Sequence, residues 1–88
     1  MHQITDQMSE KWWRYPVIIF LADGTNIKID TSRAAFNFLW DRWPAEDGPL
    51  REVALQACFD HSKGSTTQDR ARVAFVEACS EAKLIFVA

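Results

Sequence analysis

Apolar residues along the chain are spaced in a way that predicts a hairpin of two strands near the N-terminus. The run from Val17 to Leu21 is continuously apolar, which is typical of a strand buried on both faces. The turn signal Asp23-Gly24 comes next. Ile27 and Ile29 then alternate with polar residues, as in a half-buried strand. We therefore expect the first strand to be central, with helices on one face and a second covering on the other.

The first predicted helix follows the hairpin and is apolar over most of its circumference. A cap at Thr31 or Ser32 starts it, and Pro44 ends it after Trp43. Only one narrow stripe is polar. Most of the other positions are apolar: Ala34, Ala35, Phe36, Phe38, Leu39, Trp40 and Trp43. That is more apolar surface than one side of a small core usually absorbs.

Two more helices and a short strand complete the chain. Pro49 suits the first turn of a helix that ends near Gly64, which serves as its C-terminal cap. Ser65 and Gln68 fit a capping box for a third helix over about residues 66–83. The final residues, LIFVA, form a strand that can join the hairpin.

The predicted order is ββαααβ, an α+β fold with a small sheet packed on three helices. The sheet combines the N-terminal β-hairpin with the C-terminal strand. Residues 1–11 are polar and are expected to form a flexible N-terminal segment. Residues 12–88 are expected to form one domain, the usual organisation for a chain of 88 residues.

Composition limits the class of protein rather than naming it. The net charge is −2, and the basic residues are dispersed among acidic ones, so no nucleic acid is expected as a partner. The longest apolar run is too short to span a bilayer, so no membrane partner is expected. Two cysteines are too few for a disulfide framework, and no signal peptide is recognised. We expect a cytoplasmic protein.

The stretch ACFDHSKG places Cys58, Asp60 and His61 within four positions. Adjacent helical residues point about 100° apart, so Asp60 cannot orient the His61 imidazole. Cys58 and His61 share a face, and Cys79 could approach Cys58 from the third helix. Structural zinc needs four ligands, and a thiol nucleophile needs a cleft. We predict a structural role for these residues, with no catalytic residue, metal site or cofactor. A thiol or imidazole site at Cys58, His61 and Cys79 is the alternative.

Aromatic residues form a second candidate feature. Trp12, Trp13 and Tyr15 precede the first strand, and Trp40 borders the polar stripe of the first helix. Grouped exposed aromatics mark interfaces, so these four residues form a candidate interaction surface. Arg42 lies within the apolar arc of that helix. It is either an anion-binding arginine or a last-turn residue that favours the helix dipole, and we expect the second.

Four segments of this chain are similar to a known family. They are Tyr15-Pro16-Val17, AAFNFLWDRWP, ALQACFDHSKG and ARVAFVEACSEAKLIF. Over about residues 13–87 the chain resembles domain-of-unknown-function family 982, a group of small rhizobial proteins. The resemblance implies a single-domain cytoplasmic protein and implies no activity. Lys83 stands where that family is expected to have glycine. Arg72 and Glu81 are polar exceptions among the shared positions, and they could pair structurally.

Three classes of function remain open. An excess of apolar surface favours a non-catalytic protein-interaction module, whose partner is a second copy or another protein. A homodimer would form through the sheet or through the aromatic surface. A nucleic-acid-binding or regulatory protein is one alternative. A small enzyme or metal-binding protein that uses Cys58 and His61 is the other.

Overall fold

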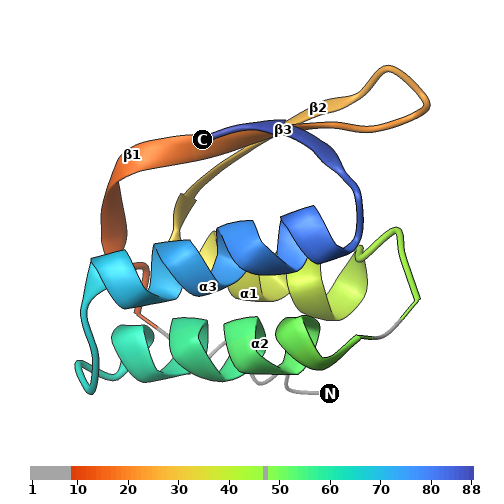
Figure 1. The fold of residues 1–88 in the computed structure, drawn as a ribbon. Helices are drawn as coiled ribbons and strands as arrows, with labels where there is room; N and C mark the ends of the chain where they lie inside the picture. The colour runs from red at the N-terminus through yellow and green to blue at the C-terminus, as the bar shows by residue number, and fades with distance from the viewer. Residues whose placement is uncertain (1–8, 47) are drawn as a thin grey trace, which may run out of the picture.

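The computed structural model describes residues 9–46 and 48–88. It has the predicted order of elements and is an α+β fold with one antiparallel sheet. All three helices lie on one side of the sheet, with α2 farthest from it (Figure 1). The elements are β1 (Trp12–Phe20), β2 (Asn26–Thr31), α1 (Ser32–Asp41), α2 (Pro49–Ser62), α3 (Gln68–Glu81) and β3 (Ile85–Val87).

The strand order β2-β1-β3 makes β1 central, as the continuous apolar run predicts. Val17 and Ile19 of β1 are fully buried against the helices. Ile18 and Phe20 point to the opposite face, where none of the described elements covers them. Within the described residues, the second covering predicted over β1 is therefore absent. A strand can be apolar on both faces and still be covered on only one.

The hairpin turns at the predicted position, and its loop spans residues 21–25. Gly24 has a φ of 90°, a left-handed conformation that glycine adopts without a steric penalty. The Leu21 amide donates to the Thr25 carbonyl over 2.9 Å and closes the loop. The Asp23 carboxylate also accepts a hydrogen bond from the Thr25 amide.

The end of the predicted flexible segment contacts the first helix. The Lys11 carbonyl accepts a hydrogen bond from the Ser32 amide over 3.1 Å, and the Glu10 carbonyl accepts one from the Arg33 amide. These carbonyls satisfy amides that a helix N-terminus otherwise leaves unpaired. Residues 1–8 of that segment lie outside the described residues.

Most of the apolar surface of α1 is buried in the core. Thr31 caps the helix, because its Oγ1 accepts a hydrogen bond from the Ala34 amide over 2.9 Å. The helix ends at Asp41, two residues before the predicted end. Trp43 remains packed edge-on against Phe38. The buried residues of α1 are Ser32, Ala35, Phe36, Phe38 and Leu39.

The predicted capping box at Ser65 and Gln68 was wrong. Thr67 is the N-cap of α3, and its side chain accepts a hydrogen bond from the Arg70 amide. The Ser65 amide instead donates to the Asp60 carbonyl over 2.8 Å and so completes the end of α2. The Gln68 side chain accepts a hydrogen bond from the Arg14 amide of β1.

Both α2 and α3 are followed by a residue with a left-handed backbone conformation. This residue is a glycine after α2 and a lysine after α3. Gly64 ends α2 with a φ of 81°, as predicted for a C-terminal cap. Lys83 has a φ of 60° after α3, and the next amide, that of Leu84, donates to the Cys79 carbonyl over 3.0 Å. A lysine in this conformation carries a steric penalty of about 1 kcal/mol that a glycine avoids.

We expect the substitution Lys83→Gly to raise the free energy of unfolding by about 0.5–1 kcal/mol, because it removes this penalty. Urea denaturation of the two proteins measures the difference. Lys63→Gly is the matched control, because Lys63 follows α2 with a right-handed φ of −94°. That control should lower the free energy of unfolding, and a loss of stability in Lys83→Gly would contradict the steric penalty assigned to Lys83.

Candidate functional site

The end of α2 separates the three chemically capable residues of ACFDHSKG, as helix geometry predicts. Cys58 is fully buried in the core. The Asp60 carboxylate accepts a hydrogen bond from the Gln56 side chain over 2.8 Å. His61 instead contacts Ser32 at the start of α1. The three side chains therefore do not form a catalytic triad.

A chain of hydrogen bonds joins Trp13, Ser32 and His61, which come from β1, α1 and α2. The indole Nε1 of Trp13 donates to the Ser32 Oγ over 2.8 Å. The Ser32 Oγ lies 2.7 Å from the His61 Nδ1. Because an indole nitrogen only donates, the hydroxyl proton of Ser32 is free to be donated to an unprotonated His61 Nδ1. We call these three residues the polar node.

The polar node is compatible with a neutral His61 ring. To accept from Ser32, the Nδ1 must be unprotonated, so the neutral ring carries its proton on Nε2. Burial lowers the pKa of His61 below its usual value, and the positive charge of Lys11 lowers it further. Both causes favour the neutral ring, whose unprotonated Nδ1 accepts the Ser32 hydrogen bond.

Sequence reasoning missed Ser32 as the partner of His61. The two residues are 29 positions apart, and Ser32 was expected only as a possible helix cap. No local spacing signals this contact, because it is created by the start of α1 directly after β2 and by the packing of α2 against α1. Ser32 is fully buried, so its hydroxyl is not open to a substrate carbonyl. A serine–histidine pair in this position links secondary-structure elements.

The two cysteines are both buried in the core and are not bridged. Burial raises the pKa of the Cys58 thiol to about 12 and that of Cys79 also to about 12. Both sulfurs are therefore protonated at neutral pH, whereas a nucleophile or a metal ligand must be a thiolate. Within residues 9–46 and 48–88, no three His, Cys, Asp or Glu side chains are grouped to hold a metal ion.

The four aromatic residues of the candidate surface have separate environments. Trp13 is only 5% exposed and packs against Phe75 with ring centroids 5.7 Å apart. Trp12 and Tyr15 are exposed on β1. Trp40 is also exposed, but it stacks on Phe36 and lines a groove between α1 and α2. Trp13 therefore belongs to the core rather than to the surface.

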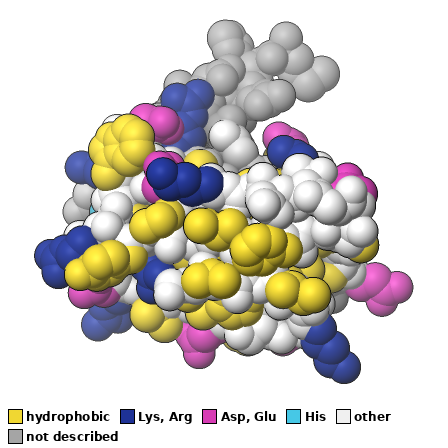
Figure 2. Space-filling model, turned by 90° about the horizontal axis from the view of Figure 1, so that it is seen from above, with side chains coloured by type: hydrophobic (Ala, Val, Ile, Leu, Met, Phe, Trp, Pro, Cys, Tyr) yellow, Lys and Arg dark blue, Asp and Glu magenta, His cyan; other side chains and the backbone are white. Residues whose placement is uncertain are grey.

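The outer face of the sheet carries an apolar patch that sequence reasoning did not locate. Two cross-strand rows run over it: Val87, Ile18 and Lys28 in one, and Ile85, Phe20 and Asn26 in the other. Ile85 is 71% exposed and Val87 is 58% exposed. Figure 2 views the molecule from this side and shows hydrophobic side chains gathered across it, with charged side chains around the edge. We call these residues the outer sheet face.

Arg42 lies directly after α1 and has a structural role there. Arg42 is the C-cap of the helix, and its amide donates to the Phe38 carbonyl over 3.1 Å. Its side chain is exposed and lines a small groove between α1 and β2. The anion-binding alternative for Arg42 stays untested.

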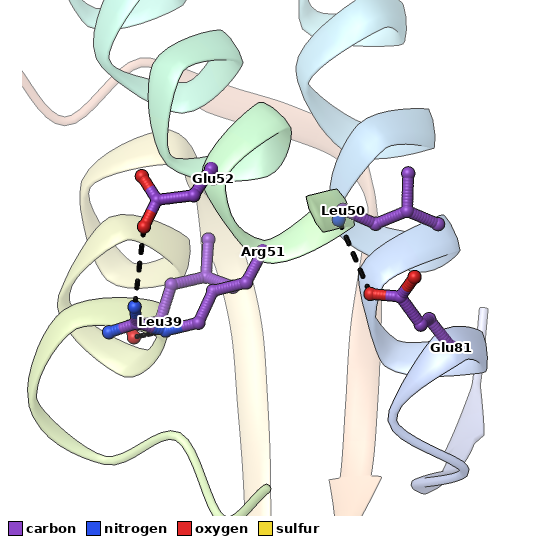
Figure 3. A network of polar contacts seen from close by, with 5 residues as sticks. All are labelled: Leu39, Leu50, Arg51, Glu52 and Glu81. Atoms are coloured by element: carbon purple, nitrogen blue, oxygen red, sulfur yellow. Dashed lines mark hydrogen bonds and ion pairs between the residues drawn. The ribbon is translucent and has the colours of Figure 1, made fainter. Parts of the chain in front are cut away.

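The polar residues Arg72 and Glu81 have different partners. The Arg72 Nε donates to the Tyr15 carbonyl of β1 over 2.9 Å. The Glu81 carboxylate accepts from the Leu50 amide over 3.2 Å and so caps α2 from the end of α3 (Figure 3). A Cβ at Gly48 would contact that carboxylate, so a larger residue there would shift the Glu81 side chain away from its capping position.

Arg51 ties the start of α2 to α1. Its Nε donates to the Leu39 carbonyl over 2.9 Å, and its Nη1 lies 3.8 Å from the Glu52 carboxylate (Figure 3). Leu39 is near the end of α1, where carbonyls have no partner within the helix. Arg51 and Glu81 therefore hold the first turn of α2 against both neighbouring helices.

The chain is similar to a known protein family and to a solved structure. A family model described as "Protein of unknown function (DUF982)" matches residues 15–86. The solution structure of Agrobacterium tumefaciens protein Atu1219, determined by NMR, is similar with a TM-score of 0.70 and 31% sequence identity. That match covers 94% of this chain and 82% of the other. A comparison with curated proteins found no match. Separately, no described helix is both long enough and apolar enough to cross a membrane.

We expect protonation of His61 to destabilise the protein, because a charged ring cannot accept the Ser32 hydrogen bond. Since the folded-state pKa is lowered, stability is complete above the unfolded value of about 6.5 and falls as the pH drops toward the folded value. Urea denaturation between about pH 7.5 and about pH 5 measures this loss.

The variant His61→Asn keeps an acceptor near the Nδ1 position but does not titrate. Its unfolding free energy should therefore depend less on pH over this range than that of the unmodified protein. His2→Asn removes the other histidine and is the control, with an unchanged pH dependence expected. Identical pH profiles for His61→Asn and the unmodified protein would contradict the role assigned to His61.

Proposed function

Because the chain belongs to the DUF982 family of proteins of unknown function, we propose that it is a non-catalytic protein-interaction module. We infer that the outer sheet face is its binding surface and that a second copy of the chain is the partner. The single observation that carries this proposal is the exposure of Ile85 and Val87 beside Ile18 and Phe20, on a sheet face that none of the described elements covers.

The apolar character of the outer sheet face supports an interface. Helices cover the centre of the inner face, so Val17 and Ile19 are buried, whereas Ile18 is half-buried and Phe20 is exposed. Burying apolar surface contributes about 25 cal/mol per Å². Contiguous exposed apolar patches on small proteins mark interaction sites more often than isolated residues do.

The charges at the edge of this face support a second copy as the partner. Lys28 and Asp30 lie on the same side of β2, and their charged groups are 4.0 Å apart. A twofold interface brings one patch against an identical patch. Opposite charges on one strand therefore allow Lys28 of one copy to face Asp30 of the other, whereas a surface of one sign would repel itself.

The free edge of the sheet adds to the same surface. β3 contains only three residues and pairs with β1 alone, so one side of its backbone has no strand partner among the described residues. Unpaired strand edges favour association with another strand. Because Ile85 and Val87 belong to this strand, its free edge borders the apolar patch.

The environment of the reactive residue types supports the non-catalytic part of the proposal. Ser32, Cys58 and Cys79 are all inaccessible to solvent, and the pKa of each thiol is raised to about 12 by burial. Each of these side chains is part of the packing or of the polar node. Interaction through a surface is the remaining activity that the exposed residues favour.

Light scattering tests this proposal directly. The protein should change from one chain to two as its concentration rises from about 10 µM to about 1 mM, the range of weak homodimers. The variant Val87→Lys should remain a single chain, because a twofold interface would bring two added charges together.

Val53→Lys is the matched control, because Val53 has a similar exposure of 54% but lies on α2. It should dimerise like the unmodified protein. A single-chain mass at about 1 mM, or loss of the dimer in both variants, would contradict the outer sheet face as a self-association surface.

A further inference from the structure

A second apolar surface lies between α2 and α3, on the helical side of the molecule. These helices pack closely because small residues, including the buried Ala54, Ala71 and Ala78, face the core. An open groove of about 530 Å³ runs along their outer side. Its lining residues are Val53, Ala57, Asp60, Thr66, Asp69, Arg70, Val73, Ala74 and Glu77. We call it the α2–α3 groove.

The floor of the α2–α3 groove is apolar and exposed. Val53 is 54% exposed and Val73 is 53% exposed, although they occupy the middle of two ordered helices. Ala57 lies one helical turn after Val53 and extends the same apolar stripe on α2. Val53 and Ala57 of α2 and Val73 of α3 therefore line the groove from its two sides.

The rim of the α2–α3 groove is acidic. Asp60, Asp69 and Glu77 line it against a single cation, Arg70, which leaves a net charge of −2 (one minus three). The Asp60 carboxylate is held in place by the Gln56 side chain. A partner with cations beside an apolar stripe would match both the floor and the rim, whereas an acidic partner would be repelled.

We propose that the α2–α3 groove binds a basic amphipathic helix of another protein. An apolar face inserted between two helices is a common way to recognise a helical segment. Each 14-residue helix that forms the groove is about 21 Å long, so the groove suits a segment of several turns. This inference rests on the interaction-module part of the proposed function but not on the homodimer, which uses a different face.

A synthetic peptide provides the test. It has about 18 residues, with leucines on one helical face and lysines on the others, and it carries a fluorescent label. Anisotropy on titration with the full chain measures its dissociation constant. A second peptide with the same leucines but glutamates in place of the lysines is the charge control. The lysine peptide should bind at least about tenfold more tightly at low salt, and added salt should reduce the difference.

Variants of the chain locate the site. Val73→Ser should weaken binding of the lysine peptide by about fivefold, because it removes apolar contact area in the groove. Its matched control is Val87→Ser, which changes a similarly exposed valine on the outer sheet face. Asp69→Asn with Glu77→Gln should weaken binding by a similar factor at low salt. Its control is Glu10→Gln with Glu46→Gln, which removes two exposed carboxylates outside the groove.

Four results would overturn the proposal. They are no binding of the lysine peptide at about 1 mM chain, equal binding of the two peptides, unchanged binding by Val73→Ser, and equal weakening by either control variant. Circular dichroism confirms that each variant is folded. Because mass and peptide binding are measured separately, a failed homodimer leaves this inference standing, and a failed groove leaves the homodimer standing.

Discussion

The rest of the structure depends on the placement of every helix on one face of a three-stranded sheet. β1 runs through the middle of that sheet, and Val17 and Ile19 form the part of the core that the helices cover. A chain of this size buries only about 60–65% of its unfolded surface. The inner face of the sheet is buried, and the outer sheet face keeps its apolar side chains in contact with solvent. The proposed homodimer follows from this one-sided packing.

Residues that suggest chemistry in the sequence hold secondary-structure elements together in the fold. The polar node joins β1, α1 and α2 through Trp13, Ser32 and His61. Glu81 caps α2 from the end of α3, and Gly48 leaves room for its carboxylate. These contacts satisfy polar groups that would cost free energy if they were buried alone.

The sequence predicts the order of elements because apolar periodicity and cap residues are local signals. Two examples are the termination of α2 before Gly64 and the turn at Asp23-Gly24. Long-range contacts are not encoded in spacing, which is why Ser32 was not identified as the partner of His61. The cap at Thr67 was missed because Ser65 and Gln68 have the spacing of a capping box. In the fold, the Ser65 amide instead bonds to the end of α2, and Thr67 caps α3. The resemblance that places a glycine at Lys83 agrees with the left-handed backbone found there.

The candidate surfaces were only partly predictable for a related reason. Sequence reasoning identifies exposed aromatics by composition, but the packing decides which of them remain exposed, as the burial of Trp13 shows. It also predicts that Val17 to Leu21 is apolar on both faces without revealing that one face stays open. The valines of the α2–α3 groove lie on predicted helices, but their exposure depends on how those two helices pack. Exposure is a property of the assembled layers rather than of any single element.

Isotope-filtered NMR on a mixture of labelled and unlabelled copies tests the central claim most directly, because it detects only contacts between two chains. The account predicts intermolecular contacts that involve Phe20, Ile85 and Val87 on the outer sheet face. Contacts that instead involve Val53 or Val73 would contradict it, and so would the absence of intermolecular contacts at about 1 mM chain.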